Sequence, residues 1–190
     1  MEPDKPSKWH HAIVVLAVLS IGMVSLLGTV SWRTSGGWSG DSIIPSCGDS
    51  VLEAESRGCH YDVMMGAWLP EECFDREFSE SLSPLEDGRW FWDPNLTKPM
   101  SKDELAGGEY VSAFSHPEFH LRHCTYMFMK LVRAYEKGWK MVDGDSMELK
   151  HREHCAKLLR DPYGFDTGHP GLVAYSRVDV SFMRCARVGR

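Results

Sequence analysis

Hydrophobic residues along this chain cluster first in one uninterrupted run. Residues 12–30 (AIVVLAVLSIGMVSLLGTV) contain no charged side chain. As a helix they would span roughly 28 Å, close to the ~30 Å hydrocarbon core of a bilayer. Two lysines precede the run, and a tryptophan flanks each end. The pattern predicts a transmembrane anchor over residues 12–32 with a cytosolic tail at 1–11. The alternative is a cleaved signal peptide, which needs a shorter apolar stretch and a small-residue cleavage site.

The segment after this run changes character. Residues 33–46 are rich in Ser and Gly, which predicts a flexible stalk. Residues 47–190 then form one predicted lumenal domain of a single-pass membrane protein of the secretory pathway, in the ER or Golgi. Asn95 begins an Asn-Leu-Thr acceptor for N-glycosylation, which fits a lumenal glycoprotein, although such tripeptides also occur by chance.

Two later segments show the 3–4 spacing of amphipathic helices. The first begins with a capping-box sequence at 115–118 and should end at Gly138. The second follows a similar box at 145–148 and should stop before Pro162. Alternation within 171–183 predicts a strand. We therefore expect an α+β fold: an N-terminal transmembrane helix, then a small lumenal domain with two motif-bearing helices and a few strands.

The two predicted helices carry the same motif, His-x-x-His-Cys, as HLRHC and HREHC. Histidines three apart on a helix lie on one face, roughly 5–6 Å apart at Cβ. Two imidazoles at that separation can share a metal ion, so the repeat predicts two halves of one site. The candidate metal-binding and catalytic residues are His120, His123, His151 and His154.

Four neutral imidazoles suit copper, iron or zinc. A structural zinc site would be closed and four-coordinate, whereas a redox or catalytic site would keep a position open. Cys124 and Cys155 have three possible roles: ligands for a soft metal, a disulfide that clamps the helices, or small buried core residues. The four cysteines outside the motifs are the candidates for structural disulfides in an oxidising compartment: Cys47, Cys59, Cys73 and Cys185.

The doubled motif resembles that of the UstYa-like family of fungal mycotoxin-biosynthesis proteins, since each copy continues into a helix with Leu or Met and a basic residue (MFMKL, AKLLR). A single N-terminal span before a small lumenal domain is also similar to that family. The resemblance covers most of residues 47–185. It implies metal-dependent oxidative tailoring of peptides, such as hydroxylation and ring closure, at the four histidines. The additional cysteines and the short chain depart from the family pattern.

These observations favour a membrane-anchored, copper- or iron-dependent oxidoreductase that modifies a peptide or small metabolite in fungal secondary metabolism. The first alternative is a non-catalytic membrane-tethered module whose histidines bind structural zinc. The second is a secreted disulfide-rich interaction protein without metal. Expected partners are the substrate, the lipid bilayer and related proteins in a homo- or hetero-oligomer. The net charge of −6 argues against nucleic acid, because a binder would show a basic face.

Overall fold

The computed structural model describes residues 44–84, 89–164 and 174–188, which form an α+β fold. Its helices are α2 (Val51–Ser56), α3 (Arg76–Ser81), α4 (Lys102–Gly107), α5 (Glu118–Glu136), α6 (Gly144–Met147) and α7 (Leu149–Arg160), with a 3-10 turn at Glu71–Cys73. Its strands are β1 (His60–Asp62), β2 (Ala67–Leu69), β3 (Trp90–Phe91), β4 (Ser112–Ser115), β5 (Met141–Asp143), β6 (Ser176–Asp179), β7 (Ser181–Phe182) and β8 (Cys185–Arg187).

The membrane part of the predicted fold class is corrected. Within the described ranges, no helix is both long enough and apolar enough to cross a bilayer. The longest, α5, has 19 residues but carries Glu, Arg, Lys and His side chains along its length. The expected anchor at 12–32, with its tail at 1–11, lies outside the described residues. The prediction of a single-pass membrane protein is therefore not retained.

The strands form three small sheets rather than one. Their orders are β1-β2-β7, β3-β4-β6 and β5-β8. All neighbours are antiparallel except β2 and β7. The strand predicted over 171–183 is found as β6 and β7, interrupted at Val180, whose N–H donates to Val111 O instead; residues 171–173 lie outside the described part. This break lets one segment serve two sheets.

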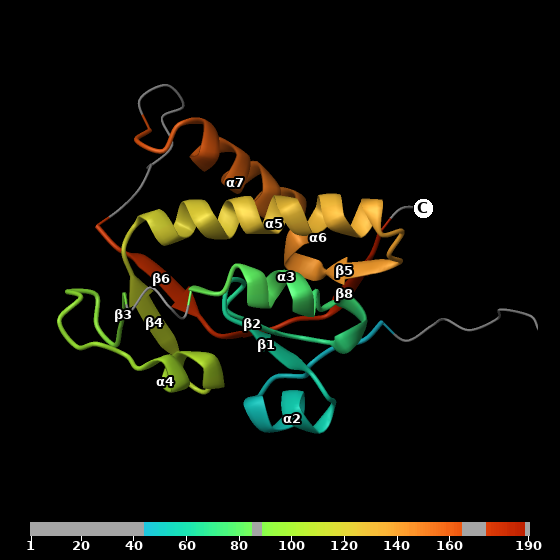
Figure 1. The fold of residues 1–190 in the computed structure, drawn as a ribbon, viewed down its shortest axis with the longest axis horizontal. Coiled ribbons are helices and arrows are strands. Elements are labelled where there is room, and N and C mark those ends of the chain that lie inside the picture. Colours follow the sequence, from blue (N-terminus) through green and yellow to red (C-terminus); the bar gives the residue numbers. More distant parts are fainter. Residues whose placement is uncertain (1–43, 85–88, 165–173, 189–190) are drawn as a thin grey trace, which may run out of the picture. The chain divides into compact units, whose positions relative to one another are not determined.

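Helix α5 lies between the strands and helix α7 (Figure 1). Phe119 and Tyr126 belong to the main core, which includes buried residues of β2 and β4. Cys124 and Met127 instead pack against Cys155 and other residues of α7. The helix therefore buries two faces, and hydrophobic residues one or two helical turns apart are present on each of them.

Three disulfides confirm the prediction of disulfide bonds. The six cysteines of the chain pair as Cys47–Cys59, Cys73–Cys185 and Cys124–Cys155. The second joins the 3-10 turn to β8, and the third joins α5 to α7. Disulfides are compatible with an oxidising compartment such as the secretory pathway.

Both predicted capping boxes are wrong: at the first site a tertiary contact uses the Ser115 hydroxyl, and at the second a residue further upstream caps the helix. Ser115 is the last residue of β4, and its hydroxyl donates to Arg89 O at 3.0 Å. Helix α5 therefore starts after Pro117 without a side-chain cap. At the second site Asp143 caps the short helix α6, accepting from Ser146 N at 2.8 Å. The helix ends were predicted better: α5 stops just before Gly138, and α7 before Pro162.

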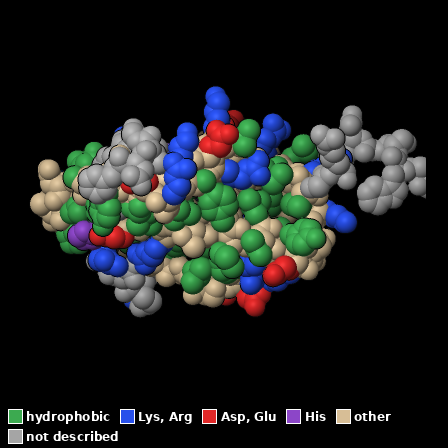
Figure 2. Space-filling view, turned by 90° about the horizontal axis from the view of Figure 1, so that it is seen from above, with side chains coloured by type: hydrophobic (Ala, Val, Ile, Leu, Met, Phe, Trp, Pro, Cys, Tyr) green, Lys and Arg blue, Asp and Glu red, His purple; other side chains and the backbone are tan. Residues whose placement is uncertain are grey.

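The surface is chemically mixed. In the view from above, positive and negative side chains are interspersed with hydrophobic ones, and histidine occupies little of the visible area (Figure 2). The four motif histidines are all partly buried.

Candidate metal centre

The fold brings the two motifs together across helices α5 and α7. His120 faces His154, with Nε2 atoms 3.2 Å apart, and His123 faces His151, with Nε2 atoms 3.4 Å apart. A later residue of one helix meets an earlier residue of the other, so the helices cross in an antiparallel sense. The two cross-helix pairs lie next to each other, since the ring centroids of His120 and His123 are 6.3 Å apart.

These separations fit metal coordination. Two imidazole nitrogens bound at ~2.0–2.1 Å to one tetrahedral ion lie roughly 3.3–3.4 Å apart. Both Nε2–Nε2 distances fall at or near this value. Each pair therefore supplies two donors at the spacing that one ion requires. The donor set, imidazole nitrogen, suits copper, iron and zinc.

His123 is held in one orientation by the backbone. Its Nδ1 lies 2.8 Å from Met64 O, in the turn between β1 and β2. A carbonyl only accepts, so Nδ1 carries the proton and Nε2 presents its lone pair to His151. Burial lowers the pKa of His123 below its ordinary value, which keeps the ring neutral. A neutral ring with a free Nε2 lone pair is the form that binds metal.

His151 has a different partner. Its Nδ1 lies 3.2 Å from a carboxylate oxygen of Asp145 on helix α6. This interaction raises the pKa of His151, in spite of partial burial that opposes it. A carboxylate behind a histidine is a common arrangement in metal sites, because it orients the ring and increases its basicity.

The cysteines of the motifs form a covalent clamp beneath the histidines. Cys124 and Cys155 are fully buried and bonded to each other, with Cα atoms 5.1 Å apart. The sulfur of Cys155 and the donor nitrogens of His123 and His151 all lie within 4.8 Å of one another. A disulfide sulfur is not a thiolate, however. Of the three roles open for these cysteines, the structure shows the disulfide, so the four histidines are the motif residues that could still hold a metal.

A cavity of about 200 Å³ opens beside the histidines. Its lining combines charged groups from α6 and β6 with hydrophobic residues from α5 and β6. The residues that line it are Met65, Phe119, His120, His123, Asp145, His151, Arg177, Val178, Asp179 and Ser181. The His123–His151 pair thus faces a space that can admit a small molecule or one group of a larger one.

Other predicted site residues lie elsewhere. Asn95 is exposed in a turn where the carboxylate of Asp93 accepts from several backbone N–H groups. The cysteines outside the motifs serve the two remaining disulfides. Sequence reasoning missed Met64 and Asp145 as partners of the histidines. Backbone acceptors have no sequence signal, and Asp145 was interpreted as a helix cap.

The sequence is similar to two curated fungal proteins. Phomopsin biosynthesis cluster proteins B′ and B of Diaporthe leptostromiformis are each 32% identical to it over 124 residues, which is 60% of this chain and 36% of theirs. The chain thus corresponds to about a third of the length of these relatives. No protein-family model matches the sequence, and no solved structure matches it.

Proposed function

We propose that the paired histidines hold a redox-active transition metal, copper or iron, and that the protein is an oxidoreductase that tailors a peptide or small metabolite in fungal secondary metabolism. One observation carries the proposal: two cross-helix Nε2 pairs at 3.2 and 3.4 Å, one of them facing a cavity. Similarity to biosynthesis cluster proteins B and B′ supports the setting.

The residues of this chain would bind and orient the metal. His123 offers a neutral Nε2, and its Nδ1 proton is engaged by a backbone carbonyl. His151 offers a second Nε2, backed by the carboxylate of Asp145. When bound, copper or iron supplies one-electron chemistry with dioxygen. In the cavity, Arg177 and Asp179 would provide charged contacts for a polar substrate.

A purely structural zinc site is the competing proposal, and two features disfavour it. The Cys124–Cys155 disulfide already joins the two helices covalently, so a metal staple would add little. A closed four-coordinate site would also have no need of an adjoining cavity, yet one is present beside His120, His123 and His151.

Elemental analysis of the full chain tests this proposal. We expect the protein to contain copper or iron near one per chain, and the double variant His123→Ala/His151→Ala to contain little. His60→Ala is the matched control, because His60 lies on β1 outside the paired histidines. Stoichiometric zinc in the wild type would favour the structural role, and a well-folded protein without metal would overturn the proposal. Metabolite profiles of a producing strain carrying the same variants would then test oxidation of a substrate.

A further inference from the structure

Beneath the histidines lies a buried group of charges, and we propose that Lys130 at its centre is a positioning residue for both His123 and His151. The inference rests on the metal centre proposed above. It concerns how the two Nδ1 partners, Met64 O and Asp145, are kept in place. None of the three ionic residues involved lines the cavity, so they act through other groups.

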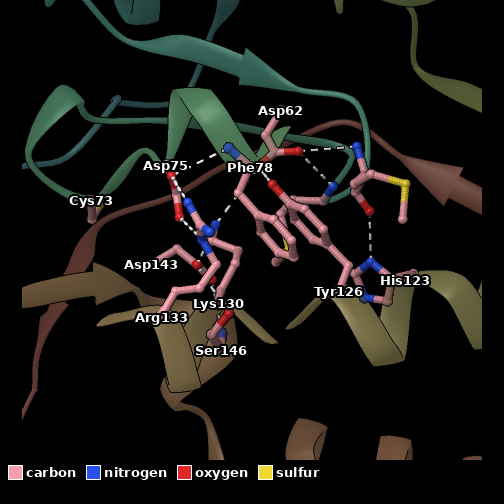
Figure 3. Close-up of polar contacts among 12 residues, drawn as sticks. Asp62, Cys73, Asp75, Phe78, His123, Tyr126, Lys130, Arg133, Asp143 and Ser146 are labelled. Atoms are coloured by element: carbon pink, nitrogen blue, oxygen red, sulfur yellow. Dashed lines mark hydrogen bonds and ion pairs between the residues drawn. The ribbon is translucent and has the colours of Figure 1, made fainter. Parts of the chain in front are cut away.

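Lys130 is fully buried on α5, in the position seven residues after His123 and so on the same face of the helix. Its ammonium lies 2.7 Å from Asp143 Oδ2 and 3.7 Å from Asp62 Oδ2 (Figure 3). Both carboxylates are also fully buried. Burial alone would lower the pKa of Lys130, but the attraction of its two negative neighbours outweighs this effect. The pKa is therefore raised and the side chain stays charged. One buried ammonium group therefore lies close to two buried carboxylates and compensates their charge.

The first anion fixes the partner of His123. Asp62 Oδ1 accepts from the backbone N–H groups of Met64 and Met65, at 3.1 and 3.2 Å. Its other oxygen accepts from the hydroxyl of Tyr126 at 2.8 Å. These bonds shape the turn after β1, and the carbonyl of Met64 in this turn accepts from His123 Nδ1. Asp62 thus sets the acceptor that selects the tautomer of His123.

The second anion fixes the partner of His151. Asp143 accepts from Ser146 at two points, the backbone N–H at 2.8 Å and the hydroxyl at 3.0 Å. These bonds cap helix α6, whose residue Asp145 lies beside His151 Nδ1. The two branches meet at Lys130 and again where the Nε2 atoms of His123 and His151 face each other at 3.4 Å. The ion cluster therefore couples the orientations of two rings that come from different helices.

The test compares three buried carboxylates. Asp62→Asn and Asp143→Asn each weaken one branch, while the variant Asp75→Asn is the matched control. Asp75 is also buried and also pairs with a cation of α5, Arg133, at 2.6 Å. Its charge attracts that of Lys130 at longer range, but its carboxylate accepts from Phe78 N and Arg133 rather than from a group of either branch. All three variants should be less stable. Only the first two should change the histidines.

Long-range proton–nitrogen NMR of the imidazole rings reads the tautomers without any metal. We expect Asp62→Asn to shift the ring signals of His123 more than those of His151, and Asp143→Asn to do the reverse. Lys130→Met should shift both if it folds, and the two Asn variants carry the test if it does not. Unchanged ring signals in both Asn variants, or equal changes in Asp75→Asn, would overturn the proposal.

Copper binding provides a second readout. With Cu²⁺ added to the protein, Asp62→Asn and Asp143→Asn should each weaken affinity by about tenfold and alter the electron paramagnetic resonance spectrum, whereas Asp75→Asn should retain the wild-type spectrum. Absence of copper binding in the wild type would contradict the proposed function. The tautomer measurement would still decide the role of Lys130, so the two failures are distinguishable.

Discussion

The two copies of the motif have identical spacing but different surroundings. His123 is almost surrounded by protein, and its Nδ1 donates to a backbone carbonyl. His151 is more exposed, and its Nδ1 faces a carboxylate. As a result the pKa of His123 is lowered by burial, and that of His151 is raised by Asp145. A repeated motif thus gives a chemically asymmetric pair, because what lies behind each ring comes from other parts of the fold.

Cutting the covalent tie between the motifs should have the largest effect. The Cys124–Cys155 bond closes a sequence separation of 31 residues, so Cys124→Ser/Cys155→Ser should lower the free energy of unfolding by about 3–4 kcal/mol. Guanidinium denaturation measures this change. The double variant Cys47→Ser/Cys59→Ser removes a bond that spans only 12 residues and should cost about 1 kcal/mol less. A larger loss in that control would contradict the chain-entropy account.

Removing the ring of His123 tests the histidine of the pair that is held by a backbone carbonyl. His123→Ala should weaken copper binding by about 100-fold, because the lost donor is neutral and already oriented. His151→Ala should cost less, since the raised pKa of His151 strengthens the competition between its proton and the metal. Isothermal titration with Cu²⁺ measures both values. If His151→Ala proves the more damaging change, the assigned asymmetry is wrong.

Asp145→Asn would make the surroundings of His151 more like those of His123, because neither ring would then face a carboxylate. Losing the carboxylate removes the main cause of the raised pKa of His151, so its pKa should fall, and copper affinity should drop by about tenfold. Histidine titration by NMR and a copper titration give the two values. Asp103→Asn, an exposed position on α4, is the control and should change neither.

The smallest effect concerns pH. A raised pKa keeps His151 protonated to higher pH than usual, and that proton competes with metal, whereas the lowered pKa of His123 makes its contribution small. Copper affinity should therefore fall by about threefold to tenfold from pH 7 to pH 6, mostly through His151. Titrations at the two pH values measure this. Asp145→Asn should show a weaker dependence, and an unchanged slope in that variant would contradict the assignment.

The sequence was sufficient for features that depend on local spacing. The positions of α5 and α7 follow from hydrophobic period, glycine and proline, and the pairing of the four histidines follows from the repeated motif. The predicted anchor rested on hydropathy and on the lysines and tryptophans beside the apolar run; those residues lie outside the described part of the structure, which contains no helix able to cross a membrane.

The ion cluster around Lys130 was beyond sequence reasoning. Its partners Asp62 and Asp143 come from other elements of the fold, β1 and β5, so no local spacing in the sequence connects them with Lys130. A lysine in an amphipathic helix is, moreover, ordinarily expected in solvent. Ser115 shows the same limit on a smaller scale. Its capping pattern was sound locally, but the strand pairing of β4 and the bond to Arg89 O took precedence.

Strand β8 has a consequence for the order in which the protein matures. It pairs with β5, placing Cys185 opposite Asp143, and Gly144 N donates to Arg184 O. The residues that hold Asp143 in place are thus added by the ribosome after both histidine motifs. While residues 184–187 are still inside the ribosomal tunnel, Asp143 lacks its strand partner. The proposed centre can accordingly form completely only after this segment has been synthesised.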